Sequence, residues 1–504
     1  MKLSRSQKAL VSTMVAFILE IVNIVSALVV PRTIMAAFGS EANGLLGSIA
    51  QFLGYISLLQ MGVGGVTRAA LYKPLALGDS QQISRVVKAM DQFFAKIGYF
   101  SIAYTVILAI VYPYLGNSSF DFSYTASMVG IIALGTIAQY LWGFTYRNLL
   151  IADQRGYISS LVTIATTIMN MLVTIVMVHL GASLHVIKLV AATVFVIQPL
   201  VLRRICIHHY GIDRNAEPDN VAIKQRWNGF LHSFADFVHR KTDIFILTIA
   251  ATLKDVSVYS VYSVITNGLN AIIAMVTGPF MSAMGNMLAR KEENVVKDTM
   301  RIYLFLTHYV STVIFSVAIL MILPFVQIYT KGIQDAEYIQ GTFAVLLLMA
   351  EMLACLKQPY GSLIGAAGHY KQTRLGPSLE ALTNLFISLI LVSKYRLVGV
   401  AAGTLVGMIV GTIYSVWYVK HNIICMDYKV SIKRYVISGL SIILIWWIGR
   451  RVSIPVENAF DWIYKAVVST VIAITIVSGI HLGFYREDMK KTIMKVLYTM
   501  GLSK

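Results

Sequence analysis

Long apolar stretches separated by short polar connections run through nearly the whole chain. Fourteen of them lie between residues 10 and 485, and most reach the roughly 20 residues that a helix needs to cross a bilayer. Because backbone polar groups inside lipid must be satisfied within the segment itself, each stretch predicts a transmembrane helix. The predicted helices cover residues 10–38, 44–72, 92–115, 123–150, 157–180, 184–203, 229–252, 257–288, 302–329, 339–366, 377–394, 398–420, 433–449 and 462–485.

The connections between these helices alternate in charge. Those on one side carry most of the Lys and Arg residues, whereas residues 116–122 and 330–338 on the other side carry at most one basic residue each. The excess of positive charge marks the cytoplasmic side, so both termini are expected in the cytoplasm. The exceptions to the pattern are Lys394, Arg396, Arg450 and Arg451.

Composition agrees with a multi-pass membrane protein. The chain is 57% hydrophobic and only 13% charged, which excludes a soluble globular domain. The formal net charge of +18 is explained by topogenic charge facing anionic lipid headgroups, and no nucleic-acid-binding motif accompanies it. The first apolar stretch is long and carries Glu20 and Asn23, so it is expected to be a retained helix and not a signal peptide. The three cysteines have no metal-ligand spacing and imply no disulfide framework.

A weak internal repeat divides the chain into two halves. Residues 39–44 lead into a long helix and a charged segment at 79–88, and residues 254–262 lead likewise into a charged segment at 291–301. Duplicated halves are common in alternating-access transporters, although convergent loop composition would give the same pattern. We therefore expect an all-α protein with two pseudo-symmetric six-helix bundles. The expected divisions are an N-terminal bundle at 1–207, a cytoplasmic linker at 208–228, a C-terminal bundle at 229–425, and two extra helices with a cytoplasmic tail at 426–504.

Charged and polar residues inside the apolar stretches are the candidates for function. A charge at mid-membrane costs about 2.5 to 3.5 kcal/mol even on the lenient insertion scale, so it normally faces a cavity or a partner. Predicted helix one carries Glu20, Asn23 and Arg32. Arg32 is either an anion ligand or an interfacial residue that snorkels to the headgroups.

Predicted helix seven carries a polar stripe. His232, Asp236, His239, Arg240 and Asp243 recur at steps of three or four and share one face. Such a face either lines a substrate path or joins the helix to its neighbours through ion pairs. We assign Asp236, Arg240 and Asp243 to a cavity, His232 to the cytoplasmic interface, and consider His239 a candidate for ion coupling because histidine titrates near physiological pH.

Other helices add further candidates. Glu380 and Asn384 share a face through their i, i+4 spacing, and Arg68, Arg147 and Lys357 are either cytoplasmic anchors or ligands. The substrate-binding candidates from these helices are Gln51, Asn267 and Glu380, and Glu351 joins His239 as a candidate for ion coupling.

Several sequence stretches resemble a known family. In the first half these are residues 32–44, 51–55 and 62–65, and in the second half 239–243, 256–262, 365–371, 380–384 and 399–404. Over about residues 10–420 the chain resembles bacterial polysaccharide flippases of the Wzx type, in the multidrug/oligosaccharidyl-lipid/polysaccharide (MOP) exporter superfamily. The resemblance implies a V-shaped, MATE-like pair of bundles in the bacterial inner membrane.

The same resemblance implies a cargo. It would be an oligosaccharide repeat unit on an undecaprenyl pyrophosphate carrier, moved from the cytoplasmic to the outer leaflet by alternating access for O-antigen, capsule or exopolysaccharide synthesis. Polysaccharide polymerase and glycosyltransferases are the implied protein partners. We hypothesise that Arg32 and Arg240 hold the pyrophosphate, since a guanidinium binds phosphate in a bidentate manner, and that Asp243 holds one arginine in place.

Three alternatives remain open at this stage. They are a lipid II flippase, a cation-coupled small-molecule exporter of the same superfamily, and a membrane-embedded glycan polymerase or ligase. No phosphate-binding loop, zinc motif or nucleophile elbow is found in the sequence, and the predicted outer connections are short for an enzyme of that class. We expect a transporter with no catalytic residue, cofactor or metal.

Overall fold

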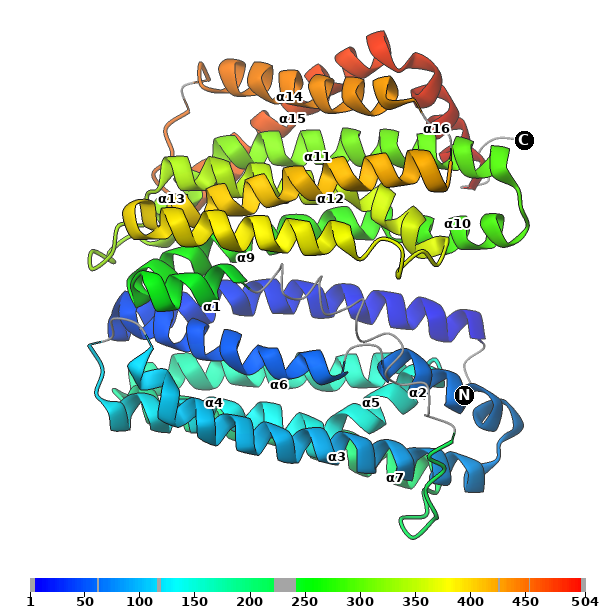
Figure 1. The fold of residues 1–504 in the computed structure, drawn as a ribbon. Coiled ribbons are helices and arrows are strands. Elements are labelled where there is room, and N and C mark those ends of the chain that lie inside the picture. The colour runs from blue at the N-terminus through cyan, green and yellow to red at the C-terminus, as the bar shows by residue number, and fades with distance from the viewer. Residues whose placement is uncertain are drawn as a thin grey trace. The chain divides into compact units, whose positions relative to one another are not determined.

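A computed structural model describes residues 5–60, 63–115, 119–221, 242–424, 427–452 and 454–499. Helices make up most of this part of the chain (Figure 1). Eleven of the described helices are long and apolar enough to cross a membrane, by length and composition. Two of them, Leu10–Gln60 and Leu375–Asn422, each join two predicted helices across a bend. The expected all-helical fold class is confirmed.

Contacts divide the chain into two compact units. Unit 1 comprises the described residues of 1–237 together with 251–257, and unit 2 those of 238–250 and 258–504. The division falls within the described helix Leu253–Thr277, whose residues 253–257 belong to unit 1 and whose remaining residues belong to unit 2.

Unit 1 is formed by the first seven α-helices of the chain. The elements are α1 (Arg5–Gly54), the 3-10 helix η1 (Tyr55–Gln60), α2 (Val63–Leu77), α3 (Ser80–Val111), η2 (Tyr112–Tyr114), α4 (Phe122–Ala138), the π-helix η3 (Gln139–Gly143), α5 (Phe144–Ala152), α6 (Gly156–His179) and α7 (Leu184–Tyr210). Helix α1 packs along α6, and α7 packs against both α4 and α6. The predicted second helix is divided between the end of α1, η1 and α2.

Unit 2 contains a central group of helices and an added pair. The elements are α9 (Leu253–Thr277), α10 (Pro279–Ala289), α11 (Glu293–Tyr329), α12 (Gly341–Ala366), α13 (Leu375–Asn422), α14 (Tyr428–Gly449), α15 (Ala459–Phe484) and α16 (Arg486–Thr499). Helix α12 packs against α11 and α13, and the C-terminal helices α14 and α15 pack on α11 (Figure 1). Residues 242–250 are also helical, and residues 229–241 of predicted helix seven lie outside the described residues.

The two charged segments of the repeat are helical and do not form loops. Helix α3 begins at Ser80, twelve residues before the predicted start, because Asp79 accepts a hydrogen bond from the Gln82 backbone N–H at 2.9 Å. A carboxylate at this N-cap position stabilises the first turn. Helix α11 likewise begins at Glu293 and not at residue 302, so both helices extend beyond their apolar portions.

Two bends replace predicted loops. Gly39 interrupts α1 with a φ of 85°, a left-handed conformation that glycine adopts without steric cost. Arg396 interrupts α13 with a φ of 45°. The chain therefore turns back at Arg396 within two residues, and the two arms of α13 pack on each other.

A row of glycines allows the two arms of α13 to approach closely. Gly403 and Gly407 lie one turn apart on the second arm. A methyl group added at Gly403 would stand 2.9 Å from the backbone carbonyl oxygen of Asn384, and one added at Gly407 would stand 2.8 Å from that of Glu380. A methyl group at Gly411 would overlap the Glu380 carboxylate. Small residues at this spacing bring helix backbones together in membranes, which places Glu380, Asn384 and Ser388 against the second arm.

Candidate functional site

A buried carboxylate in unit 2 is surrounded by oxygen atoms. Asp243 is 7% exposed and accepts hydrogen bonds from the Tyr259 hydroxyl at 2.9 Å and from the Thr404 hydroxyl at 2.9 and 3.1 Å. The Asn384 side-chain amide donates to it at 3.4 Å. These partners come from α9 and from both arms of α13, so the bend at Arg396 builds the site.

The oxygen cluster continues along α13. The Ser388 hydroxyl donates to the Asn384 side-chain oxygen at 2.9 Å, and the Thr404 hydroxyl also reaches the Val400 carbonyl at 3.0 Å. We call Asp243, Tyr259, Asn384, Ser388 and Thr404 the Asp243 cluster. Among the described residues, the hydrogen-bond partners of Asp243 are all neutral, and a buried carboxylate among neutral groups has a strong tendency to bind a proton or a cation.

The ligand types in the Asp243 cluster are those that hard cations prefer, namely carboxylate, hydroxyl and amide oxygens. Within the described ranges, no group of three or more His, Cys, Asp or Glu side chains could hold a metal ion. A site with one carboxylate therefore suits a singly charged ion or a proton better than a multivalent metal.

Two further polar groups lie in the same unit. Glu351 on α12 accepts a hydrogen bond from the Asn270 amide at 2.7 Å, and the Cys355 thiol contacts the same amide's oxygen. Glu380, 4% exposed, forms an ion pair with Lys357, whose Nζ lies 2.6 Å from both carboxylate oxygens. Glu380, predicted as a substrate ligand, thus already has a cationic partner on the neighbouring helix.

The candidates on α1 occupy unit 1. Asn23 and Arg32 are exposed, and Glu20 is partly buried. Gln51, near the end of α1, is buried, with 8% of its surface exposed. Arg68 on α2 donates to the Asn148 side-chain oxygen at 3.4 Å.

Part of the predicted polar stripe lies outside the described residues. His232, Asp236, His239 and Arg240 belong to this set, so the pairing of Asp243 with an arginine is not observed. Asn267 on α9 is described and exposed. Of the predicted cavity residues, the structure therefore brings Asp243 and Glu380 near one another, since Asn384 follows Glu380 by one turn and contacts Asp243.

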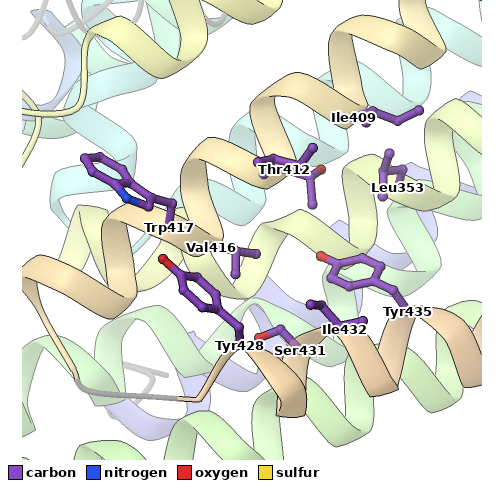
Figure 2. A pocket seen from close by; sticks show the side chains of 10 residues that line it. Leu353, Ile409, Thr412, Val416, Trp417, Tyr428, Ser431, Ile432 and Tyr435 are labelled. Carbon is purple, nitrogen blue, oxygen red and sulfur yellow. The ribbon is translucent and has the colours of Figure 1, made fainter.

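An apolar pocket opens between α12, α13 and α14 in unit 2 (Figure 2). Its volume is about 400 Å³, and its lining is Leu353, Ile409, Thr412, Ile413, Val416, Trp417, Tyr428, Ser431, Ile432 and Tyr435. Ile413, Trp417 and Ile432 are more than a third exposed. The Lys420 ammonium lies 3.6 Å from the centre of the ring of Tyr428, which is one of the lining residues. The lining is therefore mostly apolar and aromatic, and one of its rings also contacts a cation.

Sequence reasoning did not find this pocket. Its residues come from three helices and include no charge or motif, so only the packing of α14 against α12 and α13 assembles them. Thr404 was also missed as a partner of Asp243, and Ser388 as a partner of Asn384. The glycine spacing from Gly399 to Gly411 was a signal that the arms of α13 pack closely.

Comparison with known proteins identifies the fold. No protein-family model matches the chain, and no curated protein matches its sequence. The structure is similar to that of the lipid II flippase MurJ in an inward closed conformation, with a TM-score of 0.72 and 13% identity, covering 95% of this chain and 99% of that chain.

Transporters of the MATE type are also similar. An inward-facing multidrug resistance MATE family transporter of the MOP superfamily has a TM-score of 0.61 and 13% identity, covering 82% of this chain and 98% of that chain. A mutant of the Vibrio cholerae MATE transporter VcmN has a TM-score of 0.56 and 15% identity, and the similarity covers 83% of this chain and 98% of that chain. The chain therefore has the helical fold that MurJ and MATE transporters share.

Proposed function

We propose that the protein is a flippase that moves a polyprenyl-pyrophosphate-linked oligosaccharide across the bacterial cytoplasmic membrane by alternating access, with both termini in the cytoplasm. The observation that carries the proposal is the apolar pocket of unit 2, whose lining residue Tyr428 contacts the Lys420 ammonium. A long hydrocarbon chain with an anionic end matches both features, since burial of apolar surface and a cation beside a phosphate each favour binding.

The fold supports this class of function. MurJ is described as a lipid II flippase, and its similarity covers 95% of the chain against 82% for the inward-facing MATE transporter. The similar structures are described as a flippase and as transporters, which favours transport over a glycan polymerase or ligase. Lipid II and other lipid-linked oligosaccharides share the polyprenyl pyrophosphate, so the pocket suits both cargoes.

Charge in the two units suggests a division of roles. Arg32 and Arg68 lie on α1 and α2 of unit 1, and we assign Arg32 to the pyrophosphate. Arg240, outside the described residues, keeps its predicted role as a pyrophosphate ligand. Glu20, Asn23, Gln51, Asp236 and Asn267 would offer polar contacts to sugar hydroxyls. In unit 2, the Asp243 carboxylate lies among neutral hydroxyl and amide groups, which favours a cation or proton there. We assign the Asp243 cluster to ion coupling, with Glu351 and His239 as further candidates.

A variant that fills the pocket tests the proposed function. Ile432→Trp adds bulk to the pocket wall, and Val436→Trp places the same side chain one turn later on α14, outside the lining. Both native residues are more than half exposed, so both variants are expected to fold. Arrival of lipid-linked oligosaccharide in the outer leaflet should fall in Ile432→Trp only. Equal flipping by both variants would mean that the pocket holds an ordinary phospholipid chain and not the cargo.

A cation-coupled small-molecule exporter is the second candidate. The Asp243 cluster favours it, because its carboxylate lies among hydroxyl and amide groups suited to a coupling ion. Such an exporter would accelerate efflux of small cations in cells, and this efflux would be lost in Asp243→Asn and unchanged in Ile432→Trp. If the protein is a flippase, Ile432→Trp should instead reduce its transport.

A further inference from the structure

Two arginines at the end of α14 are exceptions to the charge pattern that orients the chain. Arg450 and Arg451 directly follow Gly449, the last residue of this helix, on the side of the membrane that the pattern assigns to the outside. Both residues are exposed. Because topogenic charge does not account for them, two neighbouring guanidinium groups at this position require a local cause.

Each of these arginines stacks on a tryptophan one turn earlier in the helix. The guanidinium carbon of Arg450 lies 4.8 Å from the centre of the Trp446 ring, and that of Arg451 lies 3.8 Å from the centre of the Trp447 ring. The two tryptophans are 40% and 51% exposed. A guanidinium can stack on an aromatic face and still offer its N–H donors to a ligand in its own plane. The rings therefore orient both groups without occupying their donors.

The stacking also directs both positive charges toward the apolar part of α14. Side chains on a helix point back toward its start, and contact with a ring four residues earlier shows this direction for Arg450 and Arg451. An interfacial arginine that snorkels to water extends the other way. The two guanidinium groups therefore lie closer to the middle of the helix than their own α-carbons do.

Helix α14 is short for a helix that crosses a bilayer. Lys433 is exposed near its start, and the only charged residue between Lys433 and Arg450 is Arg434, which is buried. At about 1.5 Å per residue, the α-carbons of Lys433 and Trp447 are about 21 Å apart, whereas the hydrocarbon core is about 30 Å thick. A bilayer thins beside a segment shorter than its core, which brings lipid headgroups toward the charged ends of the helix.

In the part of the chain that the structure describes, neither arginine forms an ion pair with a carboxylate. Helix α14 contains no acidic residue. The following connection contains Glu457 and leads to Asp461, whose carboxylate accepts a hydrogen bond from the backbone N–H of Glu457. A positive charge within a membrane normally has a partner, and at the end of a membrane helix the phosphate of a lipid headgroup is an anion within reach.

We propose that Arg450 and Arg451, each stacked on its tryptophan, bind the phosphate groups of anionic phospholipids in the leaflet at this end of α14. A guanidinium binds phosphate through two parallel hydrogen bonds, and the tryptophans add apolar surface at the level where acyl chains begin. Net negative charge favours a lipid such as phosphatidylglycerol over zwitterionic phosphatidylcholine. The four residues do not line the apolar pocket, so the site does not depend on the cargo.

Native mass spectrometry of the purified full-length protein, with either lipid added, tests the site. Wild type should bind its first phosphatidylglycerol more tightly than phosphatidylcholine. Arg451→Gln should weaken that binding about fivefold, and Arg450→Gln with Arg451→Gln about 25-fold, to the level of phosphatidylcholine. Trp447→Leu, which keeps both charges but removes one ring, should weaken it about threefold.

The matched control lies at the other end of the same helix. Lys429→Gln with Lys433→Gln removes the same amount of charge from exposed positions and should leave binding of the first phosphatidylglycerol unchanged, since a lysine ammonium lacks the planar fork.

Three results would overturn the proposal. The first is equal affinity of wild type for the two lipids. The second is an equal loss in the two double variants, because any surface charge would then attract the lipid. The third is wild-type affinity in Arg450→Gln with Arg451→Gln, which would make the arginines interfacial anchors only. None of these results bears on the flippase proposal, which the pocket variants test separately.

Discussion

The Asp243 carboxylate accepts hydrogen bonds from the neutral side chains of Tyr259, Asn384 and Thr404. The Thr404 hydroxyl reaches both carboxylate oxygens and also the Val400 carbonyl. If the Asp243 cluster couples ion movement to transport, Thr404→Val should lower the apparent affinity for the coupling ion about 10- to 100-fold, because it removes one oxygen without changing the side-chain shape. Transport rates in proteoliposomes, measured against sodium concentration and pH, give this affinity.

The control for this prediction lies on the same helix. Thr383 directly precedes Asn384 on the first arm of α13 and is partly exposed, so Thr383→Val should leave the affinity unchanged. An equal effect of the two variants, or transport by Thr404→Val that responds to ions as wild type does, would contradict ion coupling at this cluster.

The ion pair between Lys357 and Glu380 makes a separate prediction for stability. Glu380→Gln leaves the Lys357 ammonium without its counter-charge, and the expected cost is about 2–3 kcal/mol, less than for a fully buried pair because Lys357 keeps some exposure. The double variant Lys357→Met with Glu380→Gln should recover most of that loss, since no charge is then left unpaired. Thermal unfolding of the solubilised protein measures both, and a double variant less stable than Glu380→Gln would show that the pair is not the cause.

At the residue scale, the spacing of polar residues predicted a shared helix face better than it predicted the partners of those residues. The shared face of Glu380 and Asn384 follows from their spacing, and the structure confirms it through Gly407 and Gly411, which pack against that face. Lys357 was predicted to be either an anchor at the cytoplasmic boundary or a ligand. Its partner is 23 residues away in the chain, and only the packing of α12 on α13 brings the two charges together.

At the scale of elements, the close contact within α13 has a direct test. Gly407→Ala would place a methyl group 2.8 Å from the Glu380 carbonyl oxygen, so the two arms must separate, at an expected cost of about 1–3 kcal/mol in the free energy of unfolding. Gly361→Ala on α12, where no heavy atom lies within 4 Å of the added group, should be neutral or stabilising by up to about 1 kcal/mol. Thermal unfolding of the two variants compares them, and similar stabilities would argue against close packing.

Hydrophobic periodicity predicted the apolar parts of the elements and not their ends. The helices α3 and α11 extend into charged segments because a cap such as Asp79 stabilises a helical turn without any apolar residue. Loops were predicted around Gly39 and Arg396, but the structure has a bend at a single residue in each place. The backbone on both sides of each bend is helical. The pocket could not be predicted in this way, because no pattern along one helix encodes a gap between three.

At the scale of the whole molecule, orientation in the membrane is the first prediction. In a background with the three native cysteines replaced by serine, Asn215→Cys should react with a membrane-impermeant thiol reagent only after the cells are permeabilised. Glu337→Cys, in a connection expected outside, should react in intact cells. The reason is the excess of basic residues around residue 215. Labelling of residue 215 in intact cells would show that the predicted orientation is wrong, and the direction of transport inferred from it would be wrong as well.

The central claim is that the protein moves a polyprenyl-pyrophosphate-linked oligosaccharide between leaflets. The most direct measurement is the transbilayer movement of such a lipid in proteoliposomes that contain only the purified protein, followed by the access of an external sugar-modifying enzyme to its headgroup. The flippase account predicts that the protein makes the inner-leaflet pool accessible, that the Ile432→Trp variant does so more slowly, and that Val436→Trp equals wild type. A pool that stays inaccessible with wild-type protein would contradict it.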